Sequence, residues 1–205
     1  MSSHPGRLRK VVLASSSSAR QNVLRNAGLA FEVLPADIDE DAVKKKMRAE
    51  GCSTKDTAQR LSDLKAQKVS EQTRQAFVVG ADQMLDSDGC WFDKPKSVQD
   101  ARDQLMKLRG GKHRLFSSVS VALNGEVLFR HSECSSMTMR YFSDRFIGSY
   151  VESERDDICQ SVGGYKLEGL GIQLFAKVEG GYFDILGIPL LPLLAFLRTH
   201  GIVGD

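Results

Sequence analysis

The first hundred residues alternate between short apolar runs and stretches whose apolar positions have helical spacing. The runs 11–14 and 77–81 predict strands, and the second is continuous enough for a strand that is covered on both faces. The same pattern predicts further elements: a strand at 31–35, and helices at 19–27, at 41–72 with a break around 51–54, and at 98–108. Strands that alternate with helices predict an α/β arrangement.

The second half of the chain begins with a hairpin and ends in segments punctuated by glycine. Asn124 and Gly125 form the two-residue loop of the hairpin. The pattern predicts the following elements: strands at 115–123 and from 127 to 130 or as far as 141, a helix at 144–152, strands at 172–178 and 182–186, and a closing helix at 190–197. We find no internal repeat or low-complexity linker, so we expect one mixed α/β domain over 1–205, with a cleft between two lobes.

Composition narrows the class of protein. A chain of 205 residues that is 41% hydrophobic and 26% charged is typical of a globular protein with a full core. The net charge of +2 is too small to indicate nucleic-acid binding, and we interpret the lysine triplet 44–46 as a solvated helix face. The basic N-terminal segment 1–10 has no secretory apolar stretch, and no window is long enough for a membrane span. We therefore expect a cytoplasmic protein with no membrane or nucleic-acid partner.

The four cysteines lie far apart and lack C-x-x-C spacing, so neither a zinc site nor a disulfide framework is indicated. Other catalytic classes are also disfavoured. We find no Walker-type phosphate loop and no G-x-G-x-x-G after a strand. No nucleophile elbow or cysteine–histidine pair is present either. His113 has the chemistry of an acid, but we expect a surface histidine on a strand.

The turn after the first apolar run is rich in hydroxyl groups. Ser15, Ser16, Ser17 and Ser18 follow the strand, and Ser17 or Ser18 is placed to cap the next helix. The first N–H groups of a helix have no partner inside it and lie at the positive end of its dipole, so they bind anions. Arg20 adds a forked cation suited to phosphate. Taken alone, an ordinary capped helix with a solvated arginine is the commoner explanation.

Two carboxylates follow predicted strands. Asp82 comes directly after the run 77–81, and Glu40 lies in the acidic cluster 37–41. Carboxylates at strand ends supply oxygen ligands for a hard divalent cation, and ligands in open α/β sheets gather at those ends. Capping of a turn or of a helix N-terminus is the alternative at both places.

Lysines from two further segments would complete a polyphosphate site. Lys65 follows Leu61 by four residues on a predicted helix, so it points with the leucines toward the interior, where an ammonium needs an anionic partner. A snorkelling lysine at the edge of the apolar stripe explains this spacing equally well. Lys94, before Pro95, is a weak signal alone.

Together these segments resemble the Maf family, the septum-formation-inhibitor-like nucleotide pyrophosphatases, over nearly the whole chain. The matching motifs occur in the family's order: LASSSSAR at 13–20, DIDE at 37–40, LKAQK at 64–68, GAD at 80–82, KP at 94–95, YKLEGLG at 165–171 and GIPL at 187–190. Several short motifs in the right order are far more specific than any one of them.

The resemblance implies hydrolysis of a nucleoside triphosphate between its α and β phosphates, with Mg²⁺ or Mn²⁺. It implies a Maf/ITPase-like fold, a highly twisted mixed sheet with flanking helices and two lobes around a deep cleft, commonly in homodimers. The implied roles are a general base near the metal for Asp82 and a metal ligand for Glu40. The remaining roles are phosphate clamps for Arg20, Lys65 and Lys94, and phosphate and substrate contacts for Ser15, Ser17 and Lys166.

Three positions that differ between branches of this family bear on the nucleobase. Ala19 fits neither branch, whereas Gln83 and Glu168 resemble the branch that acts on 7-methyl-GTP rather than the one that prefers dTTP and UTP. We therefore expect a modified purine nucleotide, with dTTP or UTP as the alternative. A nucleotide-binding regulator of cell division without turnover is the alternative of a different class. The chain also departs from the family pattern at Ser18, Asp93 and Lys112, and Asp93 places an extra negative charge near the polyphosphate.

Overall fold

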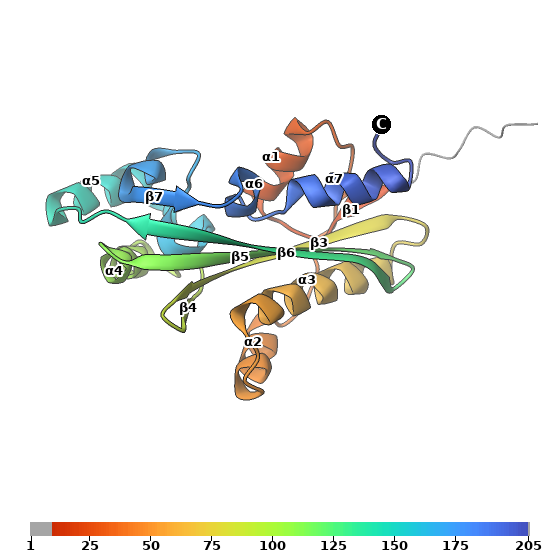
Figure 1. The fold of residues 1–205 in the computed structure, drawn as a ribbon, viewed down its shortest axis with the longest axis horizontal. Helices are drawn as coiled ribbons and strands as arrows, with labels where there is room; N and C mark the ends of the chain where they lie inside the picture. The colour runs from red at the N-terminus through yellow and green to blue at the C-terminus, as the bar shows by residue number, and fades with distance from the viewer. Residues whose placement is uncertain (1–9, 205) are drawn as a thin grey trace, which may run out of the picture.

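The computed structural model describes residues 10–204 and shows a mixed sheet with helices on both faces (Figure 1). Most of the N-terminal segment discussed above, 1–9, lies outside the described residues. The strands are β1 (Val11–Leu13), β2 (Glu32–Val33), β3 (Phe77–Ser87), β4 (Cys90–Phe92), β5 (Lys112–Leu123), β6 (Glu126–Met139) and β7 (Phe175–Glu179). The helices are α1 (Ser18–Asn26), α2 (Glu40–Ala49), α3 (Thr54–Ser70), α4 (Val98–Leu108), α5 (Asp144–Glu154), α6 (Tyr182–Ile185) and α7 (Leu190–Thr199). The predicted mixed α/β fold is confirmed.

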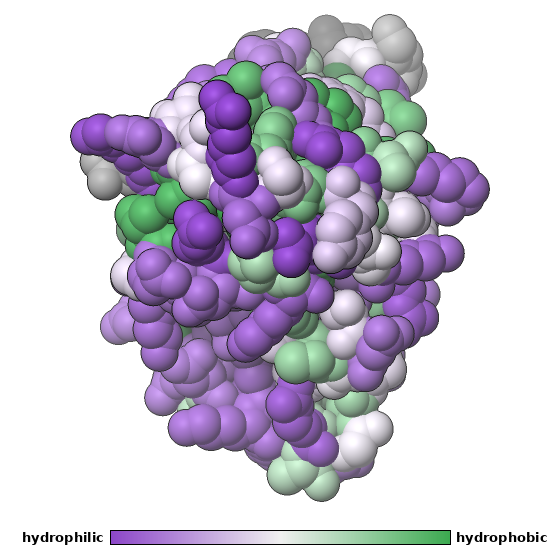
Figure 2. Space-filling model, turned by 90° about the vertical axis from the view of Figure 1, so that its left-hand side faces the viewer, coloured by the Kyte–Doolittle hydropathy of each residue, from purple (hydrophilic) through white to green (hydrophobic). Residues whose placement is uncertain are grey.

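The strand order is β2-β1-β3-β5-β6-β7, with β4 paired to β3. Strands β2, β1 and β3 run parallel, whereas β3, β5, β6 and β7 pair antiparallel. Helix α3 lies along one face of the sheet and α1 and α7 along the other, while α4 and α5 gather at one end of β5 and β6 (Figure 1). The surface at that end is mostly hydrophilic, with scattered apolar side chains (Figure 2).

Strand β3 changes partners along its length. Its first residues pair with β1 as far as Val79, and Leu85 begins the pairing with β4. Between them, along the side of β3 that faces away from β5, no described strand pairs with residues 80–84. The prediction that Asp82 ends the strand is therefore wrong: β3 continues to Ser87 because β5 pairs with it as far as Asp86 and β4 pairs with its last residues. Asp82 instead lies just beyond the end of β1, where the edge is open.

The two larger apolar cores lie at opposite ends of the sheet. One joins β1, β3 and β5 to α1 and α7, with Leu24, Phe77 and Leu193 fully buried. The other joins β5 and β6 to α4 and α5, with Leu105 and Ile147 fully buried. Each such side chain contributes about 1.5–3 kcal/mol relative to an exposed one. The two cores form the two predicted lobes, and β3 runs through both.

The glycine-rich C-terminal part differs most from prediction. The segment 182–186 is not a strand: Tyr182–Ile185 forms the short helix α6, which Leu186 caps, and Gly187 follows with φ of 94°. Residues 170–174 form a 3₁₀ turn, so strand β7 begins only at Phe175. Short apolar runs are ambiguous between helix and strand, and here the edge of the sheet is already formed by β7. No helix in the described part of the chain is long and apolar enough to cross a membrane.

Candidate functional site

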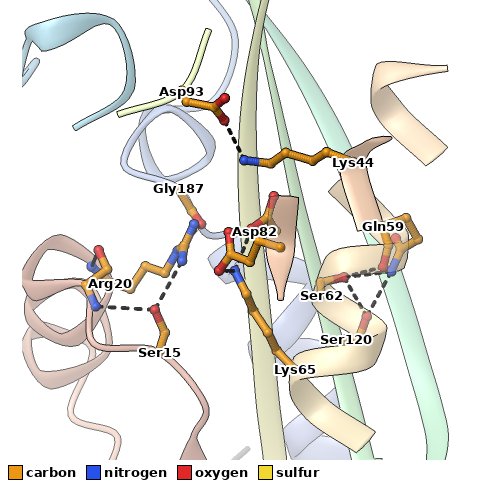
Figure 3. A network of polar contacts seen from close by, with 12 residues as sticks. Ser15, Arg20, Lys44, Gln59, Ser62, Lys65, Asp82, Asp93, Ser120 and Gly187 are labelled. Carbon is orange, nitrogen blue, oxygen red and sulfur yellow. Dashed lines mark hydrogen bonds and ion pairs between the residues drawn. The ribbon is translucent and has the colours of Figure 1, made fainter. Parts of the chain in front are cut away.

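The serine turn between β1 and α1 holds an arginine in place. Ser17 is the N-cap of α1, and its hydroxyl accepts a hydrogen bond from the Arg20 backbone N–H at 3.4 Å. The buried Ser15 hydroxyl accepts hydrogen bonds from Arg20 Nη1 at 3.1 Å and from the Ser17 N–H at 3.3 Å. Arg20 Nε donates to the Gly187 carbonyl at 2.8 Å (Figure 3). The guanidinium therefore bonds to Ser15 in the first half of the chain and to Gly187 in the second half.

Lys65 links the two candidate carboxylates. Its ammonium lies 2.6 Å from Asp82 Oδ1 and 2.8 Å from Glu40 Oε1, and the Lys65 side chain is only 9% exposed. The inward orientation predicted from Leu61 is thus confirmed, and the snorkelling alternative is wrong. The carboxyl of Asp82 is buried, and its Oδ2 atom has no hydrogen-bond partner among the described residues.

The backbone explains why these three groups meet. Side chains alternate along β3, so Asp82 faces α3, on the side opposite the Val79 and Ala81 core positions. Glu40 is the first residue of α2, and the Asp39 side chain caps that helix by accepting from the Ala42 N–H at 2.9 Å. Within the acidic cluster, the capping alternative therefore applies to Asp39, while Glu40 reaches Lys65.

Basic groups surround the carboxylates. Burial alone would raise the pKa of Glu40, but Lys65, Lys44 and Arg20 outweigh it, so the Glu40 pKa lies below its usual range. Burial lowers the pKa of Arg20 against the opposing effect of the carboxylates. Desolvation lowers the pKa of Lys94, and the nearby Arg20 lowers it further. Arg20 and Lys94 are thus two desolvated cations close to one another, and a bound polyanion would offset the cost of burying them.

Lys44 also belongs to this cluster of charged side chains, although its sequence context did not predict a place in the site. Its ammonium lies 2.5 Å from Asp93 Oδ1, and its side chain is only 20% exposed, so the expectation of a solvated face is wrong at this position (Figure 3). Burial works to lower the pKa of Lys44, but Asp93, Asp82 and Glu40 raise it overall. The signal was present in the helical spacing, because Lys44 follows Glu40 by four residues and shares its helix face.

All of the predicted site residues line one cavity of about 440 Å³, a size typical of small-molecule sites. These residues are Ser15, Ser17, Ala19, Arg20, Glu40, Lys65, Asp82, Gln83, Lys94, Lys166 and Glu168. The side chains of Lys44, Phe92 and Asp93 add to the same lining. Residues from both halves of the chain therefore meet in a single hollow.

The loop 162–169 forms one wall of the cavity and is supported by a buried histidine. His113 is 1% exposed, and its Nε2 lies 2.7 Å from the Tyr165 hydroxyl. The expectation of a surface histidine is therefore wrong, because Tyr165 of the loop packs over this side chain of β5. Lys166, the next residue of the wall, pairs with Asp157 at 2.9 Å.

The carboxylate oxygens of the site suit a hard divalent cation that is coordinated partly by the protein and partly by a bound ligand. The described residues contain no group of three or more histidine, cysteine, aspartate or glutamate side chains that would enclose a metal by themselves. Asp82 and Glu40 are nevertheless adjacent, and the unpartnered Oδ2 atom of Asp82 is a buried oxygen that still needs a partner. Mg²⁺ is commonly held by one or two carboxylates together with substrate phosphates and water.

The family model described as "Maf-like protein" matches residues 10–200. The chain belongs to the Maf-like protein family. The resemblance inferred from the motifs is therefore confirmed.

Curated relatives cover nearly the whole of this Maf-like chain. It is 48% identical to a protein named "Nucleoside triphosphate pyrophosphatase" from Granulibacter bethesdensis, over 93% of this chain and 97% of that one. A protein of the same name from Paramagnetospirillum magneticum is also 48% identical, over 93% and 98%. A Brucella abortus protein named "7-methyl-GTP pyrophosphatase" is 47% identical, over 93% and 96%.

Proposed function

We propose that this Maf-like protein is a nucleoside triphosphate pyrophosphatase that hydrolyses the bond between the α and β phosphates. One observation carries the proposal: Lys65 joins Asp82 and Glu40 at the floor of a cavity that Arg20 and Lys94 also line. A carboxylate pair beside several cations is suited to water activation and phosphate binding together. The names of the full-length relatives support the same activity.

In the proposed reaction, the chain's own residues hold the triphosphate and move one proton. Asp82 would accept the proton of the attacking water, while Lys65 binds and orients its carboxyl. Arg20 and Lys94 would bind the phosphate oxygens and stabilise the charge of the departing pyrophosphate. The Ser15 to Ser17 turn and the first N–H groups of α1 would hold one phosphate group.

We propose Mg²⁺ or Mn²⁺ as the cofactor, held by Asp82 and Glu40. When bound, such an ion would neutralise phosphate charge and lower the pKa of a coordinated water. The fit rests on the adjacent carboxylates and the unpartnered Oδ2 atom. A homodimer, a cytoplasmic location and a single functional domain stay predictions.

For the nucleobase we propose a purine nucleotide such as 7-methyl-GTP. The Brucella relative that bears this name supports it. Glu168 lines the cavity and supplies an acceptor that suits the donor edge of guanine. A preference for dTTP or UTP is the alternative, and the assay below separates the two.

The test is a turnover assay with 7-methyl-GTP, GTP, dTTP and UTP, each with Mg²⁺ or Mn²⁺, in which the products are identified. We expect a monophosphate and pyrophosphate, and a rate that falls at least about 100-fold in Asp82→Asn. Asp88→Asn, an exposed substitution outside the cavity, is the matched control and should keep the wild-type rate. Orthophosphate with a diphosphate would refute the proposed reaction, and nucleotide binding without turnover would favour the regulator.

A further inference from the structure

The short helix α6 is fastened to the sheet by one amide and one hydroxyl. Gln83 Nε2 lies 2.9 Å from Ser117 Oγ, 3.1 Å from the Asp184 carbonyl and 3.0 Å from the Ile185 carbonyl. Ser117 Oγ in turn donates to the Asp184 carbonyl at 2.6 Å. Carbonyl oxygens only accept, so the nitrogen of the Gln83 amide must face them. The orientation of this side chain is therefore determined by its neighbours.

The same short segment holds Arg20. Gly187 lies two residues beyond the end of α6, and its N–H donates back to the Asp184 carbonyl at 3.0 Å. The Gly187 carbonyl accepts from Arg20 Nε at 2.8 Å. Figure 3 shows the two residues side by side. Gly187 has φ of 94°, a conformation that suits glycine, and an added Cβ would lie 3.4 Å from Arg20 Nε. The position of the guanidinium thus depends on where residues 184–187 are held.

A direct role for Gln83 in recognising a nucleobase fits this geometry poorly. Both N–H groups of the amide are used by three acceptors within the protein. Only Oε1 is left for a ligand, so the amide cannot offer the paired donor and acceptor that a base edge would engage. Gln83 also lies on the face of β3 opposite Asp82, toward α6, because side chains alternate along a strand.

We propose that Gln83 is a positioning residue for Arg20. Its amide, together with the Ser117 hydroxyl, holds the 184–187 segment, and the Gly187 carbonyl then sets the direction of the guanidinium toward the phosphates. The role rests on the proposed function in one respect, since it assumes that Arg20 binds a phosphate chain. It revises the assignment of Gln83 to the base, which the sequence resemblance implied.

The proposal is tested with a ligand that has no base. Inorganic tripolyphosphate binding is measured by calorimetry for the wild type, Gln83→Met and Ser117→Ala. We expect Gln83→Met to weaken binding about tenfold, the factor that corresponds to one hydrogen bond to a charged group, and Ser117→Ala to weaken it less. The affinities for 7-methyl-GTP and UTP should fall by the same factor. Gln173→Met, which alters an exposed side chain away from the cavity, is the matched control.

A double substitution checks that the effect passes through Arg20. In an Arg20→Met background, Gln83→Met should cause no further loss of tripolyphosphate affinity, because the contact that it orients is already gone. An unchanged tripolyphosphate affinity in Gln83→Met, combined with a loss for 7-methyl-GTP alone, would overturn the proposal and restore the base-reading role. An additive loss in the double variant would also overturn it.

A spectroscopic readout separates this proposal from the proposed function. In the free protein, the Arg20 Nε–H signal should exchange slowly with solvent, because it is bonded to the Gly187 carbonyl. Gln83→Met should speed that exchange while thermal unfolding shows a folded protein. Unchanged exchange would overturn the positioning role even if the enzyme hydrolyses nucleotides. Faster exchange would support it even if no nucleotide is turned over or tripolyphosphate fails to bind.

Discussion

Replacing Gly80 with alanine tests how tightly α3 must approach β3 for the site to form. A Cβ at Gly80 would lie 2.3 Å from the Ser62 carbonyl oxygen and 2.6 Å from the Ala66 N atom. Both are backbone atoms of α3, so no side-chain rotation relieves the clash. Gly80 does not have a positive φ, so alanine is compatible with its backbone and the effect is steric. Relief to an ordinary contact distance requires α3 to retreat by about 1 Å.

The same displacement of α3 moves Lys65, which lies between Ser62 and Ala66 on that helix. The hydrogen bond from Lys65 to Asp82 is 2.6 Å long, and a displacement of about 1 Å would take it beyond hydrogen-bonding distance. Overpacking of this kind costs about 1–3 kcal/mol of unfolding free energy. A misplacement of about 1 Å at a catalytic group can reduce turnover about 100-fold. We expect Gly80→Ala to show both losses.

The assay pairs denaturant unfolding with the rate of pyrophosphate release. The matched control is Gly148→Ala in α5, where the nearest atom to an added Cβ is 3.8 Å away. Alanine should stabilise that helix by about 0.5–1 kcal/mol and leave turnover unchanged. Wild-type stability in Gly80→Ala would refute the steric reasoning. Lost stability with wild-type turnover would show instead that Lys65 follows Asp82 despite the moved helix.

Two further predictions concern titration and charge. Burial lowers the pKa of His113 from 6.5 to about 4, so the unfolded chain binds the extra proton first as the pH falls. The free energy of unfolding that depends on neutral His113 should therefore be fully present above pH 6.5 and should fall by roughly 3 kcal/mol toward pH 4. Chemical denaturation at several pH values measures this decline, which should be absent in His113→Asn. Asp93→Asn removes a negative charge that pairs with Lys44, so it should tighten tripolyphosphate binding about threefold at low salt, and less at high salt. Calorimetry that shows weaker binding would instead indicate that Asp93 orients Lys44.

The local elements of this protein were determined by its sequence. The helix predicted at 98–108 has those bounds in the structure, and the hairpin around Asn124 and Gly125 forms as expected. Ser17 caps α1, and Lys65 points inward, which in each case is one of the two outcomes that the local pattern allowed. Each of these features depends on residues within a few positions of one another, so periodicity, capping and turn chemistry predict it or narrow it to two alternatives.

The shape of the site was decided only by the tertiary structure. Asp82 lies inside β3 rather than at its end, because β5 continues to pair with the strand after β1 has stopped. Lys44 reaches Asp93, and Gln83 faces the carbonyls of α6, through contacts between segments 49 and about 100 residues apart. The local sequence pattern shows which side chains are charged and which neighbours lie on the same face of a helix or strand. Strand pairing and helix packing determine which groups, distant in sequence, become their hydrogen-bond partners. Neither has a local signature in the sequence.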